Sequence, residues 1–476
     1  MKKLQNILSL LALIISLASI SVGQNQTNIE GNWLGVIEFS GMKLRLAFKV
    51  HRSTDGYTAK FDSIDQAATD LQIDSVTQQG DSVKFDASKL GFTFEGKLNE
   101  KGDEINGSFN QGPAAMPVVL RRVTELPTIG RPQDPQKPYP YLEEEVSYKN
   151  VTDNVKLAGT LTLPRTGTNH PAVILITGSG GQDRNETIAG HRPFLVLADS
   201  LTRKGVAVLR VDDRGVGGSD LGPLTATSES YAGDVLAGIQ YLKIRKEINA
   251  KQIGLIGHSE GGMIAPLVAA RSNDVAFLVL LAGLGQTGAD VMYQQTELIH
   301  KASGVSPSIT AETIAVLKST IEILKTKPDK KTAEQLIRAG IARQSAEIPD
   351  DQKKDFAPIK AMMEAQIPMY VSEWFRFFAA FDPQPTLKTV RIPVLALNGE
   401  LDLQVPWKEN LDLIAAALKA GANKDYTVKA FPKLNHLFQT CQTGLPSEYG
   451  KIEETISPQV LQTVSDWILE RTINER

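Results

Sequence analysis

The sequence predicts an α/β protein in which a mostly parallel sheet is covered by helices and carries a helical lid, with a small antiparallel β domain before it. Three observations predict this class. Continuous apolar runs alternate with helix-like stretches beyond residue 141, residues 285–385 are helix-like without an intervening strand, and residues 24–125 hold short alternating strands. Continuous apolar runs are typical of strands covered on both faces, whereas alternation indicates strands with one face exposed.

The first 23 residues are predicted to be a signal peptide and not part of the fold. Lysines at positions 2 and 3 precede an apolar stretch from about Ile7 to Ile20, and small residues before Gln24 fit a cleavage site. The apolar stretch is short for a membrane-spanning helix, which needs roughly 20 residues. We therefore expect a secreted or periplasmic protein that does not span a membrane.

Residues 24–125 are predicted to form the small β domain. The run "GMKLRLAFKV" alternates apolar and polar residues, and the strand-like runs "DSVKFDA", "GFTFEGKL" and "INGSFN" are separated by the polar turns "QQGD", "NEKGDE" and "NQGPAAMP". Short strands joined by polar turns predict a small antiparallel sandwich or barrel. The run "GNWLGVIEF" at its start resembles the opening strand of lipocalin-like domains. Such a domain would hold a small apolar ligand, shield a nearby site, or contribute stability or dimerisation.

A proline-rich linker, residues 126–141, is predicted to separate this domain from the main one, because its prolines favour an extended chain. Residues 142–476 would form the α/β domain. Its predicted strands are "VKLAGTLTL", "AVILIT", "VAVLRV", "IGLIG", "AFLVLLAG", "VLALNG" and "YTVKAF". In open α/β sheets the reactive groups lie beyond the carboxyl ends of the strands, so the residues after each run are the candidates for chemistry.

The segment 285–385 is predicted to be a helical lid over that edge of the sheet. It ends in the aromatic-rich run "MYVSEWFRFFAAFDPQP". We expect most of these aromatic side chains to attach the lid to the core, and one or two to line an acyl pocket.

Composition excludes several classes of function. The net charge is −3, which offers no electrostatic basis for nucleic-acid binding. The single cysteine, Cys441, excludes an internal disulfide. No group of His, Cys or carboxylate residues has metal-ligand spacing, so we expect neither a metal nor an organic cofactor. Nothing in the sequence specifies an oligomeric state.

The pentapeptide "GHSEG", residues 257–261, predicts a nucleophilic serine. It follows the apolar run "IGLI" and precedes the helix-like run "MIAPLVAA". A G-x-S-x-G motif between a strand and a helix forms a sharp turn that exposes the serine, and glycines two positions away on each side prevent collisions. Ser259 is therefore the predicted nucleophile.

Elimination among the six histidines leaves His436 as the predicted general base. It lies in "FPKLNHLFQ", directly after the last strand-like run. His258 is adjacent to Ser259, but side chains at neighbouring positions diverge in a tight turn, so we assign it to packing under the turn. The other four lie in the β domain, before a strand, in a loop after a strand, and in the lid: His51, His170, His191 and His300.

The remaining catalytic groups are predicted from the loops after two strands. Asp402, in "VLALNGELDLQVP", is the acid that would orient the histidine, with Glu400 as its rival. The backbone N–H groups of Glu260 and Ser179 would bind the oxyanion, with Gly180 as the rival of Ser179. The loop "ITGSGGQDRNE" is not a P-loop, because no Gly-Lys-Ser/Thr follows its glycines. The run "DDRGVGGSD", residues 212–220, is predicted to support the site without taking part in catalysis.

With these residues placed, the chain from about Glu143 to Arg476 resembles the α/β-hydrolase superfamily. Within it, the chain resembles exported bacterial carboxylesterases grouped with serine-aminopeptidase-like hydrolases. The motifs that carry the resemblance are "GSGGQDRNE", "DDRGVGGSD", "GHSEGG", "WFRFFAAFDP", "NGELDLQVP", "LNHLF" and "EETISPQVLQTVSDWI". The resemblance implies Ser259 as nucleophile, Asp402 as acid and His436 as base, and it does not fix the substrate. We predict a serine hydrolase that acts on small-molecule carboxylic esters.

Two rival functions stay open. The first is an exopeptidase, for which Glu364 and Glu373 of the lid could bind the amino terminus of a peptide. The second is a non-catalytic protein that captures a ligand through its β domain.

Overall fold

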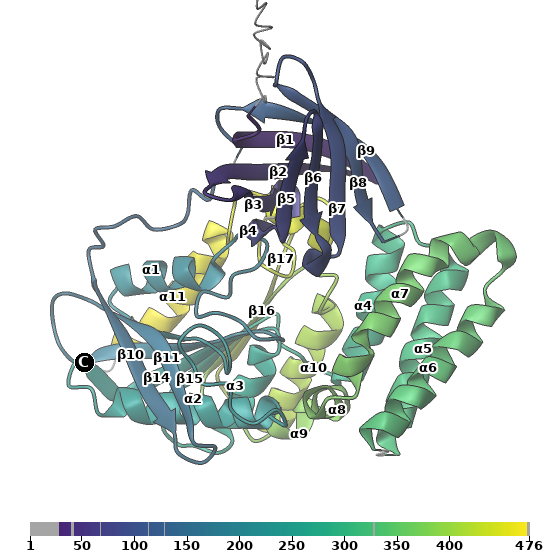
Figure 1. Cartoon of the computed structure of the whole chain (residues 1–476). Helices are drawn as coiled ribbons and strands as arrows, with labels where there is room; N and C mark the ends of the chain where they lie inside the picture. The colour runs from purple at the N-terminus through teal and green to yellow at the C-terminus, as the bar shows by residue number, and fades with distance from the viewer. Residues whose placement is uncertain are drawn as a thin grey trace, which may run out of the picture. The chain divides into compact units, whose positions relative to one another are not determined.

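The chain divides into two compact units, residues 1–127 and 128–476, in this computed structural model (Figure 1). The structure describes residues 28–39, 42–66, 68–112, 114–127, 129–326 and 329–473. The predicted signal peptide, residues 1–23, lies outside the described residues.

The N-terminal unit is a closed antiparallel β-barrel. Its sheet has the order β2-β1-β9-β8-β7-β6-β5-β3-β4, and a further pairing of β2 with β3 closes it. The barrel alternative is confirmed and the sandwich is wrong, because a sandwich would leave two separate sheets with open edges. The strands are β1 (Gly31–Phe39), β2 (Met42–Ser53), β3 (Gly56–Ser63), β4 (Ala68–Gln72), β5 (Ser75–Gln79), β6 (Ser82–Ala87), β7 (Phe92–Leu98), β8 (Glu104–Gln111) and β9 (Ala114–Val123).

Aromatic side chains fill the inside of this barrel. Trp33, Phe48, Phe85 and Phe94 are fully buried, and the rings of Phe48 and Phe85 stack with centroids 4.4 Å apart. Along β6 and β7 the buried residues alternate with half-buried or exposed ones, which is the pattern that the sequence shows. The hydrophobic core of the unit is therefore the barrel interior itself.

The predicted turn "NQGPAAMP" is partly wrong, because β9 already begins at Ala114. Met116 and Val118 face the barrel core, and Pro117 lies between them opposite Ser108 of β8. The pairing of β9 with β1 covers only residues 121–123. A proline, which has no N–H to donate, is therefore placed where β9 has a strand on one side only.

The second unit is built on an eight-stranded mixed sheet with the order β10-β11-β13-β12-β14-β15-β16-β17. The neighbouring strands pair in parallel from β13 through β12, β14, β15 and β16 to β17. The pairs β10–β11 and β11–β13 are antiparallel. This is the α/β-hydrolase fold that the sequence predicts. The strands are β10 (Leu142–Asn150), β11 (Val155–Leu163), β12 (His170–Ile176), β13 (Ala207–Val211), β14 (Ile248–His258), β15 (Phe277–Leu281), β16 (Val394–Gly399) and β17 (Tyr426–Phe431).

Helices cover both faces of this sheet, as the continuous apolar strands require. Val173 and Leu175 of β12 pack with α1 (Pro193–Arg203) and α11 (Pro458–Ile473) on one face. Ile174 and Ile176 pack with α2 (Ser228–Lys243), α3 (Gly261–Ala269) and α10 (Trp407–Ala420) on the other. None of the described helices is long and apolar enough to cross a membrane.

The helical insertion lies between β15 and β16 and has a hydrophobic core of its own. Figure 1 shows α5, α6 and α7 side by side as a bundle. Phe378 of α8 shares a second hydrophobic cluster with Met263 of α3, which attaches the insertion to the start of that helix. The helices are α4 (Gly288–Ala302), α5 (Pro307–Lys325), α6 (Lys330–Glu347), α7 (Lys353–Tyr370), α8 (Glu373–Ala380) and α9 (Pro383–Leu387).

Candidate active site

Ser259 occupies a strained turn between β14 and α3. Its φ is +53°, a left-handed value that costs a non-glycine residue about 1–2 kcal/mol. Its backbone N–H donates to the carbonyl of Leu281 at 2.8 Å, which holds the turn on the edge of β15. A Cβ on Gly257 would overlap the carbonyl of Gly261, and one on Gly261 would overlap the carbonyl of Ile176. Both glycines are therefore required for the strand and helix to meet at this angle.

Asp402 and His436 form a buried pair in the loops after β16 and β17. His436 Nδ1 donates to Asp402 Oδ2 at 2.8 Å, and the two residues are 5% and 2% exposed. Asp402 Oδ1 accepts the backbone N–H groups of Gln404 and Val405 at 2.8 and 2.9 Å. The carboxylate is thus fixed by its own loop, and it holds the imidazole in the tautomer that presents a basic Nε2.

The loops that carry Ser259 and His436 meet at the carboxyl edge of the sheet. His258, the last residue of β14, donates from Nε2 to the backbone carbonyl of His436 at 3.0 Å. Glu400, the rival acid, is exposed, and its own backbone N–H donates to Phe431. The geometry therefore pairs Asp402 with His436.

Two backbone amides beside Ser259 are available to a ligand. The Cα of Gly178 lies so close to the serine that an added Cβ would be 3.2 Å from Ser259 Cβ. The Gly178 N–H is already bound to Glu186 Oε1 at 2.7 Å. Within the described residues, the N–H groups of Glu260 and Ser179 donate to no protein acceptor. Unpaired amides at a helix start and in a glycine-rich loop suit a developing oxyanion.

The run at residues 212–220 fixes the loop that carries the Ser179 amide. Asp212 accepts the backbone N–H of Arg184 at 2.9 Å and pairs with its guanidinium at 2.7 Å. Asp213 accepts Thr177 Oγ1 and the Gln182 N–H, each at 2.9 Å. Desolvation, which outweighs these two hydrogen bonds, raises the pKa of Asp213 to about 7. Asp212 and Asp213 therefore hold this loop in place through hydrogen bonds and an ion pair.

Two groups of this site were not found from the sequence. Glu186 is buried to 1% exposure and binds both Gly178 and His258 Nδ1, the latter at 2.9 Å. The Glu260 carboxylate accepts Trp374 Nε1 at 2.9 Å and Ser228 Oγ at 2.6 Å, and burial raises its pKa. Both glutamates stand inside motifs that the sequence analysis quotes, but motif spacing carries no signal for the partners that their side chains find in space.

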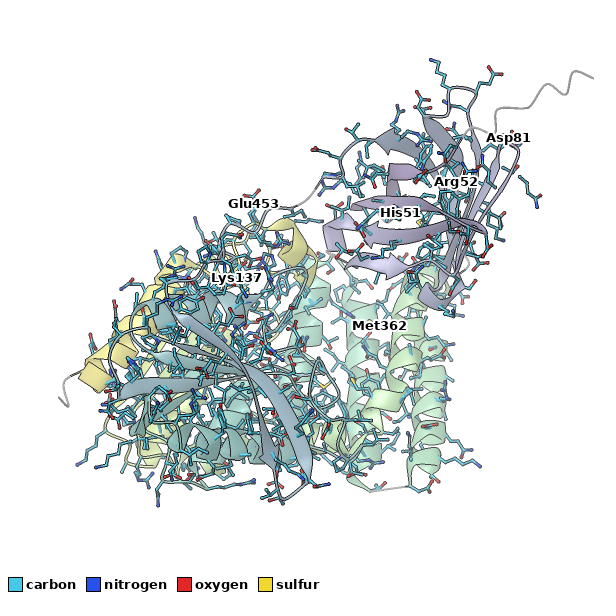
Figure 2. The ribbon with its side chains drawn as sticks, turned by 60° about the vertical axis from the view of Figure 1, so that its left-hand side comes forward. His51, Arg52, Asp81, Lys137, Met362 and Glu453 are labelled. Atoms are coloured by element: carbon cyan, nitrogen blue, oxygen red, sulfur yellow. The ribbon has the colours of Figure 1, made fainter. Side chains whose placement is uncertain are left out.

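The other histidines lie elsewhere. His51 is exposed on β2 of the N-terminal unit, where Figure 2 labels it beside Arg52. His170 begins β12, at the amino end of the strand, and His300 lies in α4 of the lid. His191 is fully buried between Thr455 Oγ1 and the carbonyl of Tyr449. Among the described residues, no group of three or more His, Cys, Asp or Glu side chains is placed to hold a metal ion.

The strand order of this unit is that of the α/β-hydrolase fold, and both the turn at Ser259 and the Asp402–His436 pair lie at the carboxyl edge of its sheet. Comparison with known proteins finds similarity to hydrolases. Residues 192–373 match the family described as serine aminopeptidase, S33. Over 328 residues the chain is 27% identical to esterase EstD of Thermotoga maritima, which covers 68% of this chain and 68% of that protein.

Two solved structures match this chain at low sequence identity. The α/β hydrolase GrgF from Penicillium is 16% identical with a TM-score of 0.44, and the match covers 70% of this chain and 99% of GrgF. The Pyrococcus furiosus esterase Pf2001 is 15% identical with a TM-score of 0.43, and the match covers 73% and 99%.

Proposed function

We propose that this protein is a serine hydrolase that cleaves carboxylic esters, with short acyl groups as its preferred substrates. One observation carries the proposal: a left-handed serine at a strand–helix turn shares the carboxyl edge of the sheet with a buried Asp402–His436 pair. The similarity to esterase EstD supports an ester substrate.

In the first half of the reaction, His436 Nε2 takes the proton of Ser259 Oγ while this oxygen bonds to the ester carbonyl carbon. The carbonyl oxygen becomes an oxyanion, which the N–H groups of Glu260 and Ser179 stabilise. As the carbonyl re-forms, the C–O bond to the alcohol breaks, and His436 returns the proton to the departing alkoxide. The product of this half is an acyl-Ser259 ester.

Water releases the acid in the second half. His436 removes a proton from the water as its oxygen bonds to the acyl carbon, and then protonates Ser259 Oγ as the acyl–serine bond breaks. The Asp402 carboxylate stabilises the imidazolium that forms in each half. The complete reaction converts one ester and one water into an alcohol and an acid, and it returns Ser259 and His436 to their starting states.

Activity on paired substrates tests this function. Purified protein is assayed with p-nitrophenyl acetate and butyrate and with aminoacyl p-nitroanilides, alongside the Ser259→Ala variant. We expect ester hydrolysis to exceed anilide hydrolysis and to disappear in the variant. Faster anilide cleavage would contradict the ester assignment, and ester cleavage that survives in the variant would contradict the nucleophile.

The second candidate function is an exopeptidase, which the serine aminopeptidase family match favours. Such an enzyme needs unbalanced negative charge to bind the amino terminus of its substrate. Glu364 lies 3.9 Å from the ammonium of Lys360. Glu373 lines a hollow of the lid together with two more acidic and three basic side chains: Asp290, Glu322, Lys318, Lys325 and Arg376. This hollow has no excess of negative charge and is lined by none of Ser259, Asp402 and His436, so it gives the exopeptidase no support.

We also propose that the protein is exported after removal of residues 1–23. The basic start, the apolar stretch and the small residues before Gln24 support this proposal. Mass spectrometry of protein recovered from the periplasm or medium of an expressing bacterium should give a mature chain beginning at Gln24. Retention of the full-length chain inside the cells would contradict export.

A further inference from the structure

His258 joins three segments of the site, although its position in the sequence predicts only packing. Its Nδ1 lies 2.9 Å from Glu186 Oε1, and its Nε2 lies 3.0 Å from the backbone carbonyl oxygen of His436. The same Glu186 oxygen accepts the N–H of Gly178 at 2.7 Å. A single buried pair, Glu186 and His258, therefore connects the oxyanion loop, the nucleophile turn and the loop of the base.

The acceptors around His258 determine how many protons it carries. The carbonyl oxygen of His436 can only accept, so Nε2 must carry a proton. Nδ1 faces a carboxylate oxygen that is already accepting an N–H from Gly178, and such an oxygen is an acceptor when the carboxyl group is ionised. Both ring nitrogens then donate, and the residue is an imidazolium beside an anionic Glu186.

His191 provides an internal contrast in the same fold. It is also fully buried and also has one ring nitrogen, Nε2, at 2.9 Å from a backbone carbonyl. Its Nδ1 meets the hydroxyl of Thr455, which can donate a proton to it. Burial lowers the pKa of His191 to about 4, so this histidine is neutral at pH 7. The two residues differ mainly in having a hydroxyl or a carboxylate as the second partner.

The charged groups around His258 favour its protonated form. Burial lowers its pKa, but the charge and hydrogen bond of Glu186, the His436 carbonyl and the charge of Asp402 together raise it above the ordinary value. The charge of Glu186 also contributes to the raised pKa of Asp213, so a second carboxyl group lies near this pair. The His258 ring is also the neighbour of the His436 ring, with centroids 4.7 Å apart.

We propose that His258 and Glu186 form a charged positioning pair for the catalytic groups. The His258 imidazolium fixes the loop of His436 through its carbonyl and places a positive charge beside the ring that must take the proton of Ser259. Glu186 binds the Gly178 amide and thereby directs the next amide, that of Ser179, to the oxyanion. This pair deepens the proposed function and rests on it.

The pH dependence of Ser259 reactivity measures the electrostatic part of this role. In His258→Gln and Glu186→Gln the positive charge beside His436 is lost, because the first variant lacks an imidazole and the second lacks the anion that keeps it protonated. The pH below which labelling slows, the acid limb, should therefore rise in both variants. Removal of one like charge at this distance corresponds to about 0.5–1 pH unit, and the rise should be larger in His258→Gln, where the Glu186 anion stays, than in Glu186→Gln, where both charges are lost.

The experiment follows the rate of fluorophosphonate labelling of Ser259 from pH 5 to pH 9 in the mature protein, which begins at Gln24. His191→Gln is the matched control, because it removes a buried histidine that also binds a carbonyl. His191→Gln should lower the melting temperature and leave the pH of the acid limb unchanged. His258→Gln and Glu186→Gln should both move the acid limb to higher pH. If the wild-type protein is labelled normally but the acid limb is unchanged in both variants, the proposed role of the His258–Glu186 pair is wrong. The proposed function would be unaffected by that result.

A second measurement on the wild-type protein does not depend on how well the variants fold. ¹⁵N NMR of histidine-labelled protein at pH 7 should show both ring nitrogens of His258 protonated and one ring nitrogen of His191 unprotonated. A neutral His258 ring would overturn the pair. Wild-type protein that reacts with no fluorophosphonate at any pH would instead overturn the proposed function, and this proposal with it.

Discussion

Trp374 of the lid helix α8 donates its indole N–H to the carboxylate of Glu260, with 2.9 Å between Nε1 and Oε1. Glu260 follows the proposed nucleophile directly and begins the turn into α3. The same carboxylate accepts the hydroxyl of Ser228, at the start of α2. The lid is therefore hydrogen-bonded to the residue whose backbone N–H is proposed to bind the oxyanion.

Replacing Trp374 by phenylalanine tests this connection. Trp374→Phe keeps most of the ring packing but leaves the buried Glu260 carboxylate without one donor, which costs about 1–3 kcal/mol. We expect a lower melting temperature, faster proteolysis within residues 288–387 and a reduced kcat/KM. Trp467→Phe is the control, because Trp467 Nε1 has no hydrogen-bond partner among the described residues. Equal effects of the two substitutions would argue against the connection.

The acid of the triad can be tested against its sequence rival. Asp402→Asn should keep the geometry but stabilise the wrong tautomer of His436, and kcat should fall by about 10⁴-fold. Glu400→Gln changes an exposed side chain in the same loop and should leave kcat within about two-fold of wild type. Steady-state kinetics on p-nitrophenyl butyrate distinguishes the two. A larger loss from Glu400→Gln would reverse the assignment.

The backbone strain at Ser259 predicts that a glycine at this position would relieve the strain in a variant that lacks the nucleophile. Both Ser259→Ala and Ser259→Gly should be inactive. Only glycine adopts a φ of +53° without strain, so the glycine variant should be more stable than the alanine variant by about 1 kcal/mol. Thermal unfolding of the two inactive proteins measures this difference directly. An alanine variant that is the more stable of the two would mean that the turn is not strained.

Asp213 should make stability depend on pH. Desolvation raises its pKa to about 7 in the folded protein, above the ordinary 3.8, so the folded state binds more protons than the unfolded state between these values. Its contribution to stability is fully present below about pH 4 and is lost as the pH rises to about 7. Asp213→Asn removes this titration.

Melting temperatures from pH 4 to pH 8 test the role of Asp213. The wild-type protein should lose stability relative to Asp213→Asn as the pH rises. Asp351→Asn, at an exposed site, is the control and should follow the wild-type curve. Parallel curves for wild type and Asp213→Asn would contradict the raised pKa.

Local sequence patterns predict the α/β fold and the positions of the catalytic candidates, because both depend on the order of strands and the loops that follow them. Ser259, Asp402 and His436 each follow an apolar run, and the parallel strands bring their ends to one edge. The strand β10 was not predicted. Its sequence "LEEEVSYKN" forms an edge strand that pairs on one side only, so its charged residues are tolerated and conceal the alternation.

Features that depend on partners distant in the chain were beyond sequence reasoning. The pairing of β1 with β9 and of β2 with β3 closes the barrel, and no local pattern distinguishes that closure from a sandwich. His258 and Glu186 are 72 residues apart. The charge of His258 follows from a contact that only the folded chain creates, so the sequence alone indicated packing.

The most direct test of the proposed chemistry is the site of covalent labelling by a fluorophosphonate, read by peptide mass spectrometry. The proposed mechanism predicts one adduct per chain, on Ser259, that is abolished in Ser259→Ala and strongly slowed in His436→Ala. An adduct on another residue, or labelling that persists in Ser259→Ala, would contradict it.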